Sequence, residues 1–204
     1  MPGLVPKALP SELPRKNPLL LLPGTPVHVR IHGVSPVPPL APPNQLVYPA
    51  AESPASTVGG GSPIPSGGVF RVDMDNGFND GGTVGFVLRN GNITSSAASY
   101  TAGARLQFYF VGGGANYTVV DAAGTHDVGV GFTGTGLHLV VRLGTNDTYT
   151  LLAINNASNA TNTFTGTLAG TPGSTLNSVA LFNNSAGVGL QHDAFFNSLQ
   201  ILNR

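Results

Sequence analysis

Residues 104–111 read A-R-L-Q-F-Y-F-V and alternate apolar residues with polar or amphipathic ones. A period of two is typical of a β-strand with one face in a hydrophobic core, because successive side chains point to opposite sides of a strand. The pattern predicts an inward set, Ala104, Leu106, Phe108 and Phe110, and an outward set, Arg105, Gln107, Tyr109 and Val111. The inward set indicates a β-sheet core, and the outward set is a candidate binding surface.

The sequence around this stretch repeats the same kind of pattern. Short apolar runs separated by turn residues predict about ten strands, at 69–75, 83–88, 104–111, 117–120, 127–132, 137–143, 148–154, 163–168, 179–182 and 195–202. Many short strands joined by turns favour a sandwich or a barrel over a parallel sheet covered by helices. We expect an all-β fold, an antiparallel β-sandwich of jelly-roll type, although periodicity does not distinguish this topology from an immunoglobulin-like one.

Proline marks the domain organisation. The chain has 17 prolines, and all but Pro172 lie at or before Pro65. Because proline fixes φ and removes a hydrogen-bond donor, residues 1–66 are predicted to form an extended Pro-rich arm or linker. Residues 67–204 are then the sandwich domain. Within the arm, V-H-V-R-I-H at 27–32 is a candidate strand for a sheet edge, and V-G-G-G-S at 58–62 predicts a flexible joint.

Charge and cysteine content exclude several classes of protein. Charged residues make up 9% of the chain and the formal net charge is zero, against roughly 25% charged residues in typical soluble domains. The basic patch that nucleic-acid binding requires is absent. The apolar run at 19–22 is too short for the core of a signal peptide or for a membrane span. We therefore expect neither nucleic-acid binding nor membrane insertion. Without cysteine, the chain has neither disulfides nor thiolate metal sites.

An acidic, glycine-rich loop is the candidate metal site. Residues 73–82 read D-M-D-N-G-F-N-D-G-G. Calcium takes six to eight oxygen ligands, and alternate acidic positions on a bent loop supply several of them. If the first and last strands of the domain are neighbours, Asp193 would join Asp73, Asp75 and Asp80 at one site. The alternative is an ordinary solvated turn closed by hydrogen bonds from its Asp and Asn side chains.

The outward face of 104–111 is the candidate ligand site. Sugar binding combines an aromatic face with a few planar polar groups, and Arg105, Gln107 and Tyr109 are residues of these types. His138 and Arg142 point outward from the strand at 137–143, and they would extend the site if both strands lie in one sheet. The alternatives are that these side chains meet only solvent, or that the N-terminal arm lies across them.

From residue 137 onward the strands read L-H-L-V-V-R-L-G, D-T-Y-T-L-L-A-I, T-F-T-G-T-L, S-V-A-L-F-N-N and H-D-A-F-F-N-S-L-Q-I. This succession resembles the C-terminal half of concanavalin A-like (laminin-G-like) sandwiches of bacterial exported proteins. The last strand carries most of the resemblance, through Asp193, Phe195, Phe196, Asn197, Leu199 and Ile201. The resemblance covers residues 69–202 and implies a jelly roll, an extracellular setting, glycan recognition and a structural calcium. Catalytic members of that superfamily carry paired acidic residues along one strand, whereas this domain has no Glu.

Three hypotheses follow for the function. In the first, the chain is a non-enzymatic exported or surface module that binds a glycan or another surface ligand, with calcium as a structural ion. In the second, it is a structural subunit of a self-assembling particle, filament or surface layer, whose arm docks on a neighbouring subunit through residues 27–31. In the third, it is a polysaccharide-active hydrolase or lyase, although the sequence lacks an acid–base pair for that chemistry. We expect the first, with an extracellular or surface location, and rank the second close to it.

Overall fold

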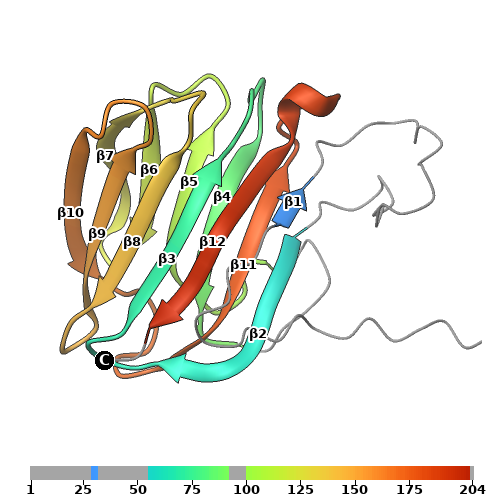
Figure 1. Ribbon diagram of the computed structural model, residues 1–204. Helices are drawn as coiled ribbons and strands as arrows, with labels where there is room; N and C mark the ends of the chain where they lie inside the picture. The colour runs from blue at the N-terminus through green and yellow to red at the C-terminus, as the bar shows by residue number, and fades with distance from the viewer. Residues whose placement is uncertain (1–28, 32–54, 92–99, 203–204) are drawn as a thin grey trace, which may run out of the picture.

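The computed structural model describes residues 29–31, 55–91 and 100–202, with side chains from residue 63 onward. The described residues form twelve strands and one short 3-10 helix (Figure 1). The elements are β1 (Val29–Ile31), β2 (Ala55–Ile64), β3 (Val69–Asp75), β4 (Thr83–Arg89), β5 (Ala104–Val111), β6 (Asn116–Asp121), β7 (Gly124–Gly131), β8 (Leu137–Leu143), β9 (Thr148–Asn155), β10 (Thr161–Thr167), β11 (Leu176–Asn184), η2 (Leu190–His192) and β12 (Ala194–Leu202). No helix in the described part is long and apolar enough to cross a membrane.

The strands pack as two antiparallel sheets of six. The front sheet, nearer the viewer in Figure 1, has the order β1-β12-β3-β8-β9-β10, and the back sheet has the order β2-β11-β4-β5-β6-β7. The chain crosses from one sheet to the other between β2 and β3, between β3 and β4, between β7 and β8, between β10 and β11, and between β11 and β12, and β1 and β2 also lie in different sheets. This antiparallel, doubly layered arrangement confirms the predicted all-β jelly-roll sandwich.

Aromatic rings from both sheets fill the centre of the sandwich. Phe70 of the front sheet lies 5.2 Å, centroid to centroid, from Phe86 of the back sheet. Phe86 is 5.6 Å from Phe108, which stacks on Tyr117 at 5.3 Å. All four side chains are fully buried, and burial of each stabilises the fold by about 1.5–3 kcal/mol. Leu106, Phe108 and Phe110 of the inward set lie in this core, as predicted.

A β-bulge at the start of β5 changes the direction of two predicted side chains. Leu88 pairs with Leu106, but Arg89 pairs with Ala104, so one residue of β5 has no counterpart on β4. The extra residue shifts the alternation by one position. Ala104 consequently packs with Val87 and Phe182 on the outer side of the back sheet, and Arg105 is buried. The predicted inward Ala104 and outward Arg105 are therefore wrong.

Two edge strands come from the Pro-rich segment. Strand β1 pairs with β12, which confirms the edge strand predicted within 27–32 for its residues 29–31. Strand β2 pairs with β11 and includes the predicted joint at 58–62, so the prediction of a flexible joint is wrong. As an edge strand, β2 tolerates Pro63, because one side of it needs no hydrogen-bond donors. The rest of the predicted arm lies outside the described residues, and the domain boundary at residue 66 stays a prediction.

Candidate functional site

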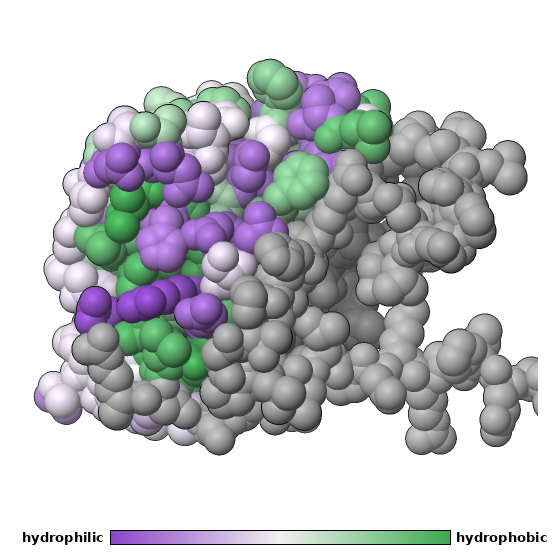
Figure 2. All heavy atoms as spheres, in the orientation of Figure 1, coloured by the Kyte–Doolittle hydropathy of each residue, from purple (hydrophilic) through white to green (hydrophobic). Residues whose placement is uncertain are grey.

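The outer surface of the front sheet presents polar side chains from three adjacent strands. In β3 the core residues Phe70, Val72 and Met74 alternate with outward ones, and the same alternation holds in β8. We call the resulting surface the front face, and its central residues are Arg71, Asp73 and Asp75 of β3, His138, Val140 and Arg142 of β8, and Phe195, Asn197 and Gln200 of β12. Figure 2 shows hydrophilic bands across this face with hydrophobic patches between them.

The centre of the front face is a cross-strand row of three polar residues. The sheet register places Asp73 opposite both Asn197 and His138. The Nδ1 atom of His138 lies 2.5 Å from Oδ1 of Asp73, and the two side chains are 34% and 32% exposed. Because a carboxylate accepts, Nδ1 of His138 donates in this contact and Nε2 points away from it. The row thus presents a carboxylate, an imidazole and an amide to solvent in one line.

The cross-strand rows on either side of this one contain a buried valine and an exposed aromatic ring. Val140 stands opposite Arg71 on one side and Leu152 on the other, and it is 5% exposed. Phe195, opposite Asp75 near the start of β12, is 36% exposed. An aromatic ring beside planar polar groups suits a ligand that has both apolar C–H faces and hydroxyl groups.

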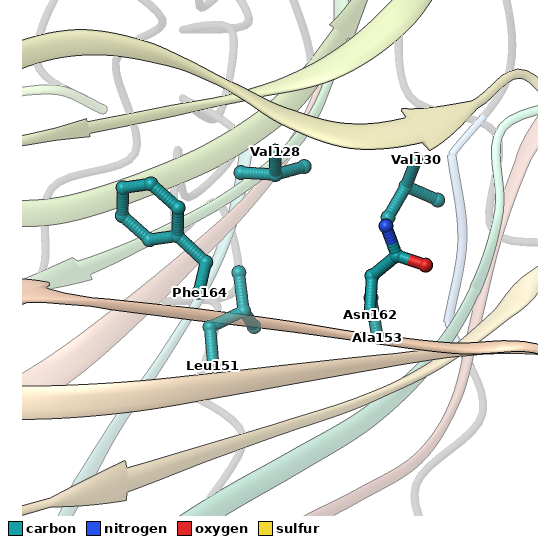
Figure 3. Close-up of a pocket in the computed structure, with 6 residues that line it drawn as sticks. All are labelled: Val128, Val130, Leu151, Ala153, Asn162 and Phe164. Carbon is teal, nitrogen blue, oxygen red and sulfur yellow. The ribbon is translucent and has the colours of Figure 1, made fainter.

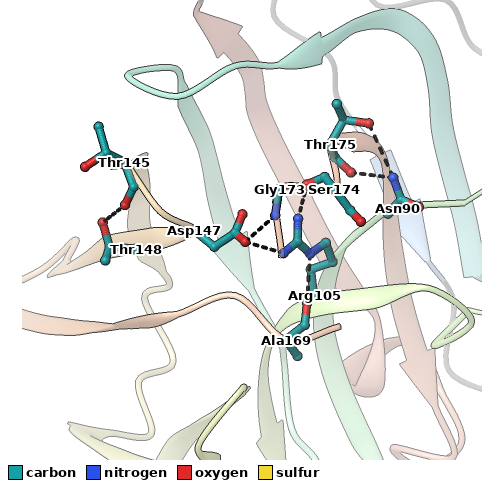
Figure 4. Close-up of polar contacts among 9 residues, drawn as sticks. All are labelled: Asn90, Arg105, Thr145, Asp147, Thr148, Ala169, Gly173, Ser174 and Thr175. Carbon is teal, nitrogen blue, oxygen red and sulfur yellow. Dashed lines mark hydrogen bonds and ion pairs between the residues drawn. The ribbon is translucent and has the colours of Figure 1, made fainter. Parts of the chain in front are cut away.

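Arg105, predicted to face a ligand, instead holds the lower end of the sandwich together (Figure 4). Its side chain is 2% exposed, and its Nε donates to the carbonyl oxygen of Ala169 over 2.8 Å. A second donor of the guanidinium bonds the carbonyl of Ser174, and Nη2 lies 3.2 Å from Oδ2 of Asp147. Arg105 therefore connects β5 of the back sheet to the β10–β11 connection and to the β8–β9 turn of the front sheet. In the described structure, Arg105 therefore stabilises the fold.

Asp147 completes this contact from the β8–β9 turn. Its Oδ2 accepts a hydrogen bond of 2.6 Å from the backbone N–H of Gly173. This backbone hydrogen bond, together with the hydrogen bond and charge of Arg105, lowers the pKa of Asp147 from its usual value. Figure 4 shows the guanidinium and the Gly173 amide converging on the same carboxylate. Sequence reasoning missed Asp147, because only the tertiary structure brings this turn to β5.

The remaining predicted ligand residues separate onto opposite sides of the molecule. Strand β5 lies in the back sheet and β8 in the front sheet. The single surface that depended on both strands sharing a sheet therefore does not form. Gln107 and Tyr109 are half-buried on the outer side of the back sheet, where the ring of Tyr109 lies 6.4 Å from that of Phe182. Burial raises the pKa of Tyr109. His138 and Arg142 remain together on the front face.

Three of the four predicted metal ligands make separate contacts, and the fourth is buried. Asp73 binds His138, and Oδ1 of Asp75 accepts the N–H of Gly77 two residues later at 3.1 Å. Asp80 is 77% exposed with its Oδ2 3.4 Å from Nε2 of His192, whereas Asp193 is buried. Strands β3 and β12 are neighbours, as the metal hypothesis required.

No group of three acidic, histidine or cysteine side chains able to hold a metal ion is found among the described residues. Calcium requires several oxygen ligands converging on one point. The described side chains of Asp73, Asp75, Asp80 and Asp193 do not form such a group, and the structural calcium that the resemblance implies stays a prediction. The contact between Asp75 and the Gly77 N–H is instead that of the ordinary Asx turn, the alternative interpretation of this loop.

The loop at 76–82 packs against the β11–β12 connection at the upper end of the sandwich. The N–H of Phe78 donates to the carbonyl of Gln191 over 2.8 Å, and Nδ1 of His192 lies 3.0 Å from the carbonyl oxygen of Phe78. Gly77 has a φ of 53°, and a Cβ there would lie 2.6 Å from the backbone oxygens of Gln191 and Asp193. The close approach explains why glycine occupies this position, and it indicates a packing role for the loop.

A narrow apolar crevice opens between the edge strands β7 and β10 (Figure 3). It is lined by Val128, Val130, Leu151, Ala153, Asn162 and Phe164, and it leaves no room for a water-sized molecule. Small-molecule sites have volumes of about 300–1,000 Å³. The crevice is therefore too small for a saccharide, and the front face is the better candidate for binding.

Three histidines of the described chain contact aspartates. His126 lies 3.2 Å from Asp121, and His138 and His192 contact Asp73 and Asp80. In the part that the structure describes, none of these imidazoles has a hydrogen bond to a serine or threonine hydroxyl. A nucleophile activated by an imidazole, as in a Ser-His-Asp triad, is therefore not assembled there.

No family model matches this sequence. No curated protein matches it. Solved structures do match. A sialidase aligns with a TM-score of 0.51 and 10% identity over 89% of this chain, which spans 16% of that chain. A legume lectin-like domain from Entamoeba histolytica aligns with a TM-score of 0.51 and 11% identity, over 76% of this chain and 81% of that one. At such low identity these likenesses establish the fold alone. The protein has the concanavalin A-like jelly-roll sandwich fold that the strand motifs of residues 69–202 predict.

Proposed function

We propose that this chain is a non-enzymatic, glycan-binding β-sandwich module that binds saccharide on its front face. The observation that carries the proposal is the row formed by Asn197, Asp73 and His138 across three adjacent strands, open to solvent and flanked by an exposed aromatic ring. Strands hold these groups in fixed positions, and such preorganisation favours recognition of a rigid ligand.

Each group in the row has a defined task toward a sugar ring. The carboxylate of Asp73 accepts hydrogen bonds from hydroxyl groups, and the amide of Asn197 donates and accepts. In the neutral imidazole of His138, Nε2 is a further acceptor because Nδ1 faces Asp73. Phe195 supplies apolar surface for the C–H side of the ring. Each hydrogen bond contributes about 1 kcal/mol, or about a fivefold change in Kd.

Two further features support a binding module. The fold likeness to a lectin-like domain agrees with surface recognition by a sandwich. The described histidines do not assemble a triad, and the described acidic residues make separate contacts. With 9% charged residues and no cysteine, the composition agrees with an exported or surface protein, and we place the module there.

Binding to a glycan array by the full chain and its variants tests the proposal. His138→Ala and Asn197→Ala each remove one group of the row, and we expect binding to weaken about fivefold or more for each. Gln107→Ala is the matched control, because it removes a polar group from the outer side of the back sheet. Thermal melts verify that all variants fold.

Two results would refute the proposed site or function. Weakening by Gln107→Ala but not by the front-face variants would move the site to β5. Folded protein that binds no saccharide on the array would refute glycan binding itself.

A second candidate function rests on strand β1. Its three residues pair with Ala194–Phe196 at the edge of β12, and 23 residues separate β1 from β2. We propose, as the alternative, that the same segment of a neighbouring copy occupies this edge, so that the chain is a structural subunit of an assembly. Strand addition to a sheet edge is an established mode of association.

Light scattering of the full chain tests this alternative. Val29→Pro and Arg30→Pro form a suitable pair, because successive N–H groups point to opposite sides of a strand and one proline removes a ladder hydrogen bond. We expect an assembly in the unmodified chain and its dissociation by one of the two variants. A monomer at all concentrations would contradict the alternative.

A further inference from the structure

The distribution of positive charge on the sandwich is uneven. Between residues 63 and 202 the chain has four arginines and no lysine. Arg89 and Arg105 are buried, and the Nε of each donates to a backbone carbonyl over 2.8 Å. The other two, Arg71 and Arg142, both lie on the front face. The two arginines of this region that are not buried therefore lie on the same surface, the front face.

The sheet register makes Arg71 and Arg142 neighbours. Arg71 stands opposite Val140, two positions before Arg142 on β8. Diagonal partners of this kind lie about 7–8 Å apart at the backbone, within reach of two long side chains. A strongly hydrophilic band crosses the front face in Figure 2.

Neither guanidinium is neutralised within the described chain. Ion pairs there join aspartates to Arg105, His126, His138 and His192, and none involves Arg71 or Arg142. The Nε of Arg71 is buried and has no hydrogen-bond partner. Because this Nε is not accessible from the surface, an anion between the two arginines would instead accept charge-assisted hydrogen bonds from their terminal Nη groups.

The groups beside the arginines suit the rest of a sugar ring. Asp73 lies two residues from Arg71 on the same strand, a separation of about 6.7 Å that matches the width of one pyranose unit. A sugar with its acidic group at the arginines therefore brings its hydroxyl groups to the row of Asn197, Asp73 and His138. The two halves of the front face complement different parts of one ligand.

We propose that the front face selects an acidic saccharide, whose carboxylate or sulfate is bound between Arg71 and Arg142. This inference rests on the proposed glycan-binding function and names its ligand class. Residues 63–202 contain seven aspartates and four arginines, so the overall charge of this part of the chain does not attract anions. Selectivity for an acidic ligand must then come from the local pair of arginines, and affinity falls with rising salt as the exposed charges are screened.

Calorimetric titration of the full chain with matched ligands tests this inference. The carboxylate arm compares oligogalacturonides with their methyl esters, which keep the shape and lose the charge. The sulfate arm compares sulfated dextran oligosaccharides with unmodified ones. We expect the acidic form to bind about tenfold more tightly than its neutral counterpart in at least one arm, as charge-assisted hydrogen bonds predict. The arm that responds identifies the anion.

Variants locate the effect on the two arginines. Arg142→Gln should abolish the preference, measured as the ratio of the affinities for the acidic and the neutral ligand, whereas Arg142→Lys should retain part of it. Arg71→Gln should act in the same direction. Should half-buried Arg71 prove necessary for folding, exposed Arg142 still decides the test. Gln107→Ala, on the back sheet, should change neither affinity.

The outcomes separate this inference from the proposed function. Equal affinity for acidic and neutral saccharides, unchanged by Arg142→Gln, would overturn the acidic selectivity while glycan binding stands. A preference for acid that Arg142→Gln and Arg71→Gln leave intact would also overturn it, because the anion then binds elsewhere. Binding of no saccharide, acidic or neutral, would refute the proposed function and this inference with it.

Discussion

Replacement of Arg105 by methionine should markedly destabilise the sandwich. Methionine retains much of the aliphatic packing but removes the guanidinium, which donates to the carbonyls of Ala169 and Ser174 and pairs with Asp147. Hydrogen bonds from a charged donor contribute about 1.5–3 kcal/mol each. The two carbonyl contacts alone therefore predict a loss of at least about 3 kcal/mol in the free energy of unfolding, out of roughly 5–15 kcal/mol for a typical domain.

Urea denaturation followed by circular dichroism measures this loss. Arg142→Met is the matched control, because it makes the same chemical change at an exposed arginine of the front sheet. The control should alter stability by less than about 0.5 kcal/mol. In a domain of this size, about 3 kcal/mol lowers the melting temperature by roughly 6–12 °C. Equal stability of the two variants would refute the structural role of Arg105.

Three further predictions concern stability. Gly166→Ala should destabilise the fold by more than about 2 kcal/mol, because a Cβ would lie 2.1 Å from Oδ2 of Asp121, whereas Gly134→Ala has open space and should be nearly neutral in the same denaturation assay. Phe108→Ala, in the central aromatic stack, should lower the free energy of unfolding, measured by urea denaturation, by about 3–5 kcal/mol. Because a backbone amide and a buried guanidinium lower the pKa of Asp147, its contribution is complete above the unfolded pKa of about 3.9 and is lost as pH falls through the lower folded value. The difference in melting temperature between the wild type and Asp147→Asn should therefore shrink below about pH 4, and a difference that grows on acidification would contradict the pKa direction.

Local periodicity predicted most of the fold. Alternation in 104–111 and 137–143 identified the strands and the inward positions Leu106, Phe108 and Phe110, because a period of two depends only on neighbouring residues. The bulge at Ala104 and Arg105 was not predictable in this way, because an inserted residue leaves composition unchanged and reverses the alternation.

The glycine-rich part of β2 shows a second limit of local sequence. Residues 58–62 have few side chains to mark a strand, yet they lie within β2, in which Val58 and Gly59 pair with β11 before the register shifts. Backbone hydrogen bonds to a neighbouring strand require no particular side chain. Composition alone therefore predicted a joint where tertiary pairing forms an edge strand.

The candidate site was only partly predictable for the same reason. Sequence reasoning named His138 and Arg142 as outward residues, but their neighbours depend on which strands pair. Strand β8 pairs with β3, so His138 meets Asp73, a residue 65 positions away that had been predicted as a metal ligand. The predicted partners on β5 lie in the other sheet. Pairing between distant strands is a property of the topology, which local patterns do not determine.

Amide chemical-shift mapping by NMR tests the central claim most directly. Titration of the isotope-labelled full chain with a saccharide that it binds should shift the amide signals of Asp73, His138 and Asn197, which lie side by side on β3, β8 and β12. The signals of Gln107 and Tyr109 on the back sheet should stay in place. Shifts confined to the back sheet, or none with any saccharide, would contradict glycan binding at the front face.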